Sequence, residues 1–321
     1  MNNFVIRKRR LIMRVRYFLS FFLLCFCISS PLHTTQFKKV SSFFGGCPYE
    51  EILQKEYVIE KQGTVVIENI DGPITITTGW KKNTIFLKAT KKSNKPDQLA
   101  LINIIDKQVT PDKLLIKTEY RQPKTKGMVE YELIVPTDLR LQISVNHGSV
   151  KIQEMQGPIS VKTVQGNIEI AKTNNVIHTE AIKSGSIMID QSIGPISATA
   201  HHGDIIITHA NQSILATTNK GHIFVACVDI PSTGSIRLET HTGPITLALP
   251  TTTNATFQGK TIRGTITSDH YLTLKPCTTK LNTMAWSRFK KEIDGIFGTG
   301  EAEIKCRNHH GNIKIVETAK A

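Results

Sequence analysis

Twelve of the chain's 21 glycines begin the same five-residue pattern. The pattern is Gly, any residue, Ile or Val, any residue, and then Ile, Val, Leu or Ala. Each copy is typical of a turn followed by a short strand with alternate side chains buried. The copies begin at Gly63, Gly72, Gly148, Gly157, Gly166, Gly185, Gly194, Gly203, Gly221, Gly234, Gly243 and Gly311. Such an array predicts an all-β protein that presents a surface.

The spacing of these glycines predicts how the strands are arranged. Gly148, Gly157 and Gly166 are nine residues apart, and the same trio recurs 37 residues later at Gly185, Gly194 and Gly203. A fixed period of this kind indicates a β-solenoid, a parallel β-helix-like coil with about two short strands per coil. Ile152, Ile170, Ile189, Ile207, Val225 and Leu238 would then stack in interior columns. The alternative is an antiparallel β-sandwich or meander, which suits nine-residue spacing equally well.

The flanking sequence divides the chain further. We expect a tether over residues 31–48 and one β-repeat domain over 49–317. Within that domain, 49–145 would supply capping strands, 146–270 the regular repeats and 271–317 a C-terminal closure. Apolar residues three or four apart from Met284 to Phe297 favour a short helix or loop over an open end of the array.

Residues 1–30 predict export. Six basic and no acidic residues precede an apolar run of 12 residues, Tyr17–Ile28. This pattern is typical of a signal peptide that is removed, or of an anchor that is retained. Cys47 after Phe44-Gly45-Gly46 only loosely suggests a lipid-attachment site. The expected location is the periplasm, the cell surface or the medium, with membrane contact only through an uncleaved N-terminus.

Charge and cysteine content limit the classes of partner. The formal charge is +14 for the whole chain and falls to about +8 without residues 1–30. No dense basic cluster with interleaved aromatics remains, so we expect no nucleic-acid binding. Four cysteines follow residue 30, namely Cys47, Cys227, Cys277 and Cys306, and their pairing is open among disulfides, such as Cys277–Cys306, and isolated buried thiols.

Histidines beside the turn glycines are the one candidate for metal chemistry. His202, His222 and His241 would lie about one coil apart along one edge and could share zinc, copper or nickel. Exposed turn residues are the simpler interpretation, and a pH-responsive surface is a third. Glu154, Glu169, Asp190, Asp204 and Glu239 are scattered and form no evident pair for a polysaccharide-active enzyme. We therefore expect no catalytic residues and no cofactor.

Several stretches together carry a family resemblance. They are Gly63–Trp80, Leu114–Tyr120, Val129–Pro136, the tandem repeats from Gly148, and Gly298–Val316. In this order they resemble the bacterial putative-adhesin, β-strand-repeat domain family of unknown function. The resemblance implies an envelope-associated or secreted protein with an adhesive or structural role. Outward Thr75, Thr77, Lys151, Lys162, Thr199, Thr246 and Lys314 would contact a glycan or envelope surface. A membrane-tethered periplasmic accessory or sensing module is the alternative, and a β-helix enzyme is a third.

Overall fold

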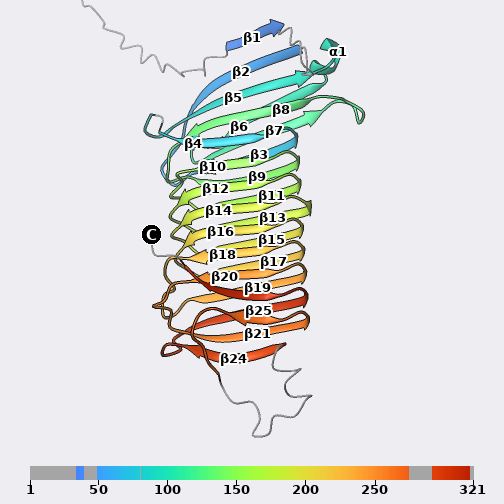
Figure 1. The fold of residues 1–321 in the computed structure, drawn as a ribbon. Coiled ribbons are helices and arrows are strands. Elements are labelled where there is room, and N and C mark those ends of the chain that lie inside the picture. Colours follow the sequence, from blue (N-terminus) through green and yellow to red (C-terminus); the bar gives the residue numbers. More distant parts are fainter. Residues whose placement is uncertain (1–33, 40–48, 80, 275–290, 319–321) are drawn as a thin grey trace, which may run out of the picture. The chain divides into compact units, whose positions relative to one another are not determined.

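Between residues 128 and 268, successive strands of the chain alternate between two facing sheets, so that each turn-and-strand pattern contributes half a coil (Figure 1). The structure is a computed structural model that describes residues 34–39, 49–79, 81–274 and 291–318. All of these lie in one compact unit, Leu32–Ala321. Over the described residues the two sheets have 13 strands each.

Sheet A and sheet B are defined by their strand order. In spatial order, sheet A consists of β1 (Thr34–Lys39), β2 (Tyr49–Val58), β5 (Thr84–Ser93), β8 (Met128–Val135), β4 (Ile74–Thr78), β10 (Val150–Gln153), β12 (Ile168–Thr173), β14 (Ile187–Ser192), β16 (Ile205–Ala210), β18 (Ile223–Cys227), β20 (Ile245–Leu249), β26 (Ile313–Glu317) and β22 (Ile266–Ser268). Sheet B consists of β23 (Thr273–Leu274), β24 (Glu292–Phe297), β21 (Ala255–Arg263), β25 (Ala302–His310), β19 (Ser235–Thr242), β17 (Ile214–Lys220), β15 (Ile196–His202), β13 (Ile177–Ser184), β11 (Ile159–Gln165), β9 (Arg140–His147), β3 (Thr64–Asp71), β7 (Lys113–Tyr120) and β6 (Ile102–Thr110). One short helix, α1 (Pro96–Leu99), follows β5.

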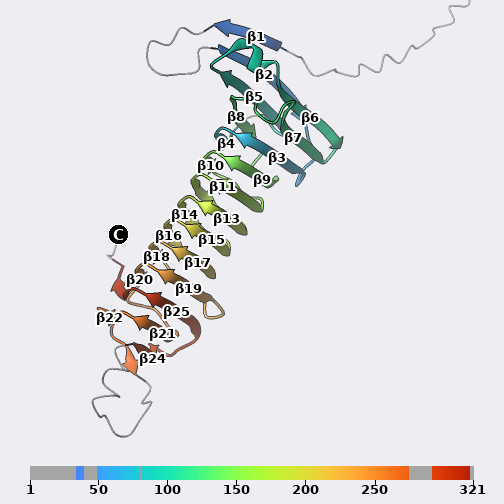
Figure 2. The ribbon, with the colours of Figure 1, turned by 90° about the vertical axis from the view of Figure 1, so that its right-hand side faces the viewer.

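The repeats wind as a solenoid with two strands per coil, as the 37-residue period predicts. In sheet A, Ile152 pairs in parallel with Ile170, and Ile170 pairs with Ile189. Two coils therefore span 37 residues, and the stack is visible side-on in Figure 2. Parallel pairing excludes the antiparallel meander for this region, because a meander joins neighbouring strands in opposite directions.

The core lies between the two sheets as columns of aliphatic side chains. The column that begins at Ile152 continues through Ile170, Ile189, Ile207, Val225, Leu247 and Ile315, all of them buried. Leu238, expected among these columns, is also buried but belongs to sheet B, where it pairs with Ala216 and Cys306. Alternation of inward and outward side chains along each strand produces this layering.

Glycines stack at the turn that leads from sheet B to sheet A. A Cβ on Gly166, Gly185 or Gly203 would overlap the carbonyl oxygen of the glycine one coil before it. The repeated glycine is therefore required because backbone approaches backbone there. Buried side chains support this row: Thr218 Oγ1 donates to the Gly203 carbonyl at 3.1 Å, and Asn308 Nδ2 donates to the Gly243 carbonyl at 2.7 Å.

At the N-terminal end, stacking order departs from chain order. β3 and β4 already pair in parallel with β9 and β10, so the coil begins at residue 64. β7 and β8 stack in parallel on the other side of β3 and β4. Antiparallel strands then extend the edge of each sheet: β5, β2 and β1 in sheet A, and β6 in sheet B. Residues 34–39, within the expected tether, are thus a strand.

A buried polar cluster links the two sheets at this end. Lys55 Nζ, on β2, lies 2.5 Å from the carboxylate of Asp106 on β6, and each side chain is at most 10% exposed. The Tyr57 hydroxyl donates to the same carboxylate. Burial and the neighbouring Asp106 raise the pKa of Tyr57, so the phenol stays protonated.

At the C-terminal end, too, the order of the strands in the stack differs from their order in the chain. β25 inserts between β19 and β21, and β26 inserts between β20 and β22. β24 then pairs antiparallel with β21, and the two-residue β23 pairs antiparallel with β24 at the end of sheet B. The short helix or loop expected over 284–297 is wrong for Glu292–Phe297, which form strand β24 on the open edge of β21; residues 284–290 lie outside the described part. No helix among the described residues is long and apolar enough to cross a membrane.

Candidate functional site

The outer face of sheet B carries two rows of side chains that cross the strands. The first row follows the register through Lys162, Glu180, Thr199, Thr217, Glu239 and Arg307. The second row lies two residues farther along each strand and contains His201, Asn219, His241 and His309. Because both rows point outward from a hydrogen-bonded sheet, their spacing is fixed by the strand separation of about 4.8 Å.

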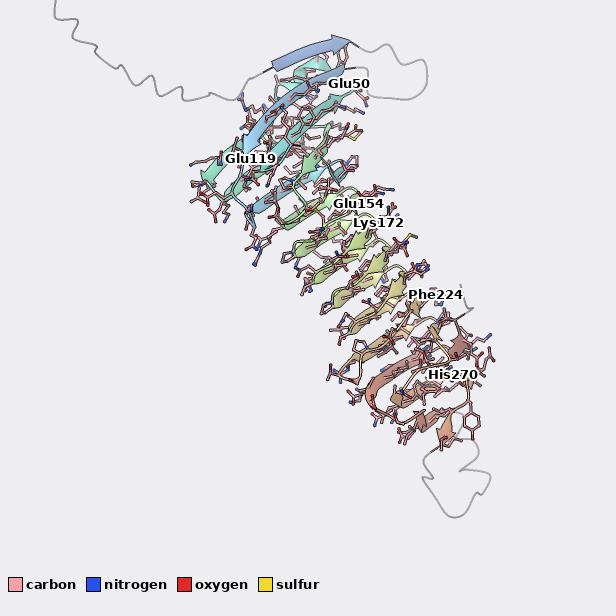
Figure 3. The ribbon with its side chains drawn as sticks, turned by 90° about the vertical axis from the view of Figure 1, so that its left-hand side faces the viewer. Glu50, Glu119, Glu154, Lys172, Phe224 and His270 are labelled. Carbon is pink, nitrogen blue, oxygen red and sulfur yellow. The ribbon has the colours of Figure 1, made fainter. Side chains whose placement is uncertain are left out.

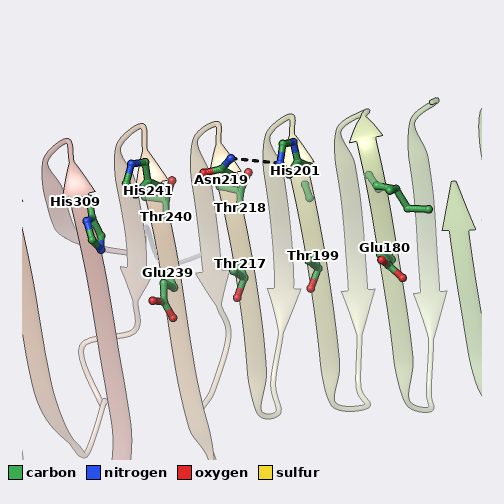
Figure 4. Close-up of a pocket in the computed structure, with 13 residues that line it drawn as sticks. Glu180, Thr199, His201, Thr217, Thr218, Asn219, Glu239, Thr240, His241 and His309 are labelled. Atoms are coloured by element: carbon green, nitrogen blue, oxygen red, sulfur yellow. Dashed lines mark hydrogen bonds between the residues drawn. The ribbon is translucent and has the colours of Figure 1, made fainter. Parts of the chain in front are cut away.

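A groove of about 380 Å³ follows these rows, and we call it the sheet B groove. Its outward lining consists of Glu180, Ile182, Thr199, His201, Thr217, Asn219, Glu239, His241 and His309. Figure 4 shows the acidic and threonine row on one side and the histidine and asparagine row on the other. The groove thus crosses β13, β15, β17, β19 and β25.

The polar groups of the sheet B groove are only partly engaged with each other. Glu180 forms an ion pair with Lys162 at 2.9 Å. His201 Nε2 lies 3.4 Å from Asn219 Nδ2, and the rings of His241 and His309 are 4.7 Å apart. The half-buried Glu239 has neither an ion-pair nor a hydrogen-bond partner among the described residues. Its carboxylate is therefore available to a donor from outside the protein.

A second groove, of about 450 Å³, lies on the same sheet nearer its N-terminal end. Its lining includes Glu68, Lys117, Glu119, Ser144 and Asn146. Lys117 Nζ lies 3.0 Å from the Glu119 carboxylate and 3.8 Å from that of Glu68. These charges pair with each other, so this groove offers fewer free groups than the sheet B groove.

The three histidines expected to share one edge lie in three different rows, which corrects that expectation. His202 pairs with Lys220 in the register of β15 and β17. His222 precedes β18; its backbone N–H donates to Asp204 Oδ1 at 2.8 Å, and its ring Nε2 is 3.1 Å from Thr246 Oγ1. His241 faces His309 instead. Among the residues that the structure describes, no group of three or more His, Cys, Asp or Glu side chains could hold a metal ion.

The sequence does not reveal which side chains lie next to His241 and Glu239 on the outer face of sheet B. His309 and Arg307 lie beside them only because β25 inserts next to β19, far from its place in chain order. From the sequence we expect His202, and not His201, to lie near His241 along one edge of the coil. Strand alternation could have separated the two, since adjacent residues point to opposite faces unless the strand bulges.

The outer face of sheet A is polar at its ends and apolar in its middle. The row that contains Thr75, Lys151, Thr246 and Lys314 also contains Glu169, Met188, Ile206 and Phe224. Lys151 and Glu169 form an ion pair at 2.8 Å. On the same coils, Glu154 and Lys172, which are labelled in Figure 3, form another at 3.1 Å. Met188, Ile206 and Phe224 therefore interrupt the expected polar row.

The acids considered for catalysis on sheet A are each engaged. Glu169 pairs with Lys151, and Asp204 accepts the His222 backbone N–H. Asp190 accepts hydrogen bonds from Thr208 Oγ1 at 2.6 Å and from His209 Nδ1 at 2.7 Å. Partial burial alone would raise the pKa of Asp190, but these hydrogen bonds outweigh burial and lower it. All three carboxylates therefore already have partners within the protein.

Cys227 and Cys306 are free thiols in the core. Burial raises the pKa of each to about 12, so neither is a nucleophile at neutral pH. Because the Cys306 thiol is free, the Cys277–Cys306 bridge is not formed. Cys47 and Cys277 themselves lie outside the described residues.

Comparison with protein families identifies the fold family. The model of the Toastrack DUF4097 family matches residues 57–316. The chain belongs to this family. The match spans the coil, both of its exchanged ends and the sheet B groove, which accords with the all-β repeat architecture. A comparison with the curated proteins found no match.

Solved structures similar to this Toastrack chain include three bacterial proteins. A putative cell adhesion protein from Clostridium sporogenes ATCC 15579 is 10% identical, with 83% of this chain and 99% of that chain covered and a TM-score of 0.27. A putative adhesin from Bacteroides fragilis NCTC 9343 is 14% identical, with 83% and 97% covered and a TM-score of 0.35. A putative adhesin from Parabacteroides distasonis ATCC 8503 is 9% identical, with 83% and 97% covered and a TM-score of 0.41.

Proposed function

We propose that this Toastrack protein is exported and acts, without catalysis, as an adhesive or structural component of the cell envelope. The observation that carries the proposal is the outer face of sheet B, where polar side chains repeat at every coil on a rigid scaffold. Contacts with a glycan or envelope surface would each be weak. Many of them, held at fixed spacing, would add to a strong attachment.

The composition of residues 1–30 supports export. Their basic start and apolar run would keep the first residues on the cytoplasmic side and carry the remainder across the membrane. Cleavage would release the β-repeat domain, whereas retention would make the protein a membrane-tethered module. No nucleic-acid partner is expected, and the N-terminal segment is the one proposed membrane contact.

Cell fractionation combined with N-terminal sequencing tests the compartment. We expect the protein outside the cytoplasm, with a new N-terminus near residue 30. Leu23→Arg with Leu24→Arg places charge in the apolar run and should retain the protein in the cytoplasm. Val58→Arg with Val109→Arg is the matched control, because both side chains are exposed and lie outside that run. Cytoplasmic wild-type protein with residues 1–30 attached would contradict export.

Binding to immobilised glycans and to isolated envelopes tests the adhesive role. We expect retention on at least one envelope glycan without release of a smaller product. Product release would instead favour a polysaccharide-active enzyme. A membrane-bound protein whose N-terminus is intact and whose outer faces bind no glycan would favour the tethered sensing module.

A further inference from the structure

The sheet B groove has a direction, because it crosses strands instead of following one. Its lining comes from five successive strands, β13, β15, β17, β19 and β25. Four steps of about 4.8 Å make it about 19 Å long. A ligand that fills it must be extended along the stacking axis, and it meets a new pair of side chains at each step (Figure 4).

The lining chemistry excludes several classes of ligand. It contains two carboxylates and no lysine or arginine, which disfavours a polyanion. Ile182 is its one large aliphatic residue, so an acyl chain or an apolar peptide would find little to bury. The remaining groups are hydroxyls, an amide and imidazoles, which both donate and accept hydrogen bonds. Such a lining suits a chain that carries many hydroxyl groups and no negative charge.

We propose that the sheet B groove binds a single linear, neutral polysaccharide chain laid along the stacking axis of the coils. This inference rests on the proposed adhesive function and names the ligand class and the face that binds it. Sheet A lacks an equivalent row, since Met188, Ile206 and Phe224 occupy its middle.

Glu239 is the strongest single contact of the proposed site. It lies between Thr217 and Arg307 in the register of its row and beside His241 in the lining. Its carboxylate has no partner among the described residues, and hydrogen bonds from hydroxyls to an ionised acceptor are stronger than those between neutral groups. Thr217, in the next coil, adds a neutral hydrogen bond.

Calorimetric titration of the full-length protein with neutral oligosaccharides tests the proposal. The probes are linear glucan, xylan, mannan and N-acetylglucosamine oligomers, from disaccharide to octasaccharide. We expect the affinity for at least one series to rise with chain length until the ligand spans about 19 Å and then to level off.

Four substitutions locate the site. Glu239→Gln should weaken binding about tenfold and Thr217→Val about threefold, through loss of a charged and a neutral hydrogen bond respectively. Glu169→Gln and Thr267→Val are matched controls on the outer face of sheet A and should leave the affinity within about twofold. Thermal unfolding of all four variants checks that the fold is unchanged.

Three results would overturn the groove assignment: no binding to any neutral series, binding of polyanions or peptides in its place, or equal losses in the sheet A controls. The assignment and the proposed function can fail separately. If Glu239→Gln attaches to envelopes as strongly as the wild type and binds oligosaccharide with unchanged affinity, the groove assignment fails and the adhesive role stands. If the groove binds oligosaccharide but the protein is cytoplasmic, the exported role fails and the groove assignment stands.

Discussion

At the scale of single residues, the glycine row sets how closely the coils can stack. Gly203 has φ of +154° and faces the Gly185 carbonyl oxygen, whereas Gly79 has φ of +105° and a Cβ added there would meet nothing within 4 Å. Gly203→Ala should therefore cost about 3 kcal/mol of unfolding free energy, from strain and from backbone overlap. Gly79→Ala should cost about 1 kcal/mol, from strain alone. Urea unfolding of both variants gives the comparison, and equal losses would show that backbone approach is unimportant.

A second residue-scale prediction concerns acid stability. Partial burial of Asp190 acts to raise its pKa, but the hydrogen bonds from His209 and Thr208 outweigh burial and lower the folded-state pKa. This carboxylate therefore stabilises the fold above its unfolded pKa of about 3.9, and the contribution should disappear as pH falls through the lower folded pKa. Because Asp190 is 38% exposed, we expect less than about 1 kcal/mol.

The measurement is urea unfolding of wild type and Asp190→Asn over a series of pH values. Wild type should be the more stable protein near neutral pH, and the difference should shrink below about pH 4. Thr208→Val, which removes one of the two side-chain donors, should give a smaller difference of the same sign. A difference that is constant with pH would show that Asp190 ionisation does not contribute.

At the scale of elements, the last two strands of the chain, β25 and β26, form a coil that lies inside the stack and not at its end. Ile304, Cys306, Ile313 and Ile315 of β25 and β26 are fully buried between the coils of β19–β20 and β21–β22. A chain that ends after Glu301 should lose on the order of 5 kcal/mol or more, through exposure of this apolar surface. Circular dichroism and size-exclusion chromatography should show unfolded or aggregated protein.

The matched control for this truncation ends after Thr318 and removes only residues 319–321. It should unfold at the wild-type temperature. A folded, monomeric protein that ends after Glu301 would mean that β21 and β22 can pair directly with β19 and β20 when the last pair is missing.

The regular coils could be predicted from sequence because each one is local. Gly166, Gly185 and Gly203 mark successive coils. After each glycine, successive side chains point alternately into the core and out to solvent. The ends could not be predicted in this way, since β7–β8 and β25–β26 pair with strands distant in sequence. Lys172 and Gln191 also have positive φ at a corner of the coil, without glycine to signal it.

The candidate site could be predicted only in part, for the same reason. Thr199 is expected from the sequence to point outward, and it does. The groove, however, also depends on His309, which β25 brings beside His241 from the far end of the chain. Local pattern thus predicts which residues face outward, whereas the exchanged order of strands decides which of them become neighbours.

At the scale of the whole molecule, the coils behave as exchangeable units. In a solenoid each repeat contacts only its neighbours, so stability is approximately a sum over repeats and interfaces. Deletion of residues 167–203 removes one 37-residue period and joins Gly166 to Asp204. β11 would then lead into β16, which keeps the alternation between sheet B and sheet A and stacks Val161 on Ala216 in the core.

This deletion should fold, with a lower thermal midpoint and an unchanged strand signature in circular dichroism. The control removes residues 167–194 and joins Gly166 to Pro195, so that β11 leads into β15. Both strands belong to sheet B, and the alternation is broken at the junction. The control should therefore fail to fold although it deletes fewer residues. Equal behaviour of the two deletions would contradict the two-coil period. The two junctions are meant to differ in one respect, namely whether the strand that follows β11 lies in the opposite sheet or in the same sheet.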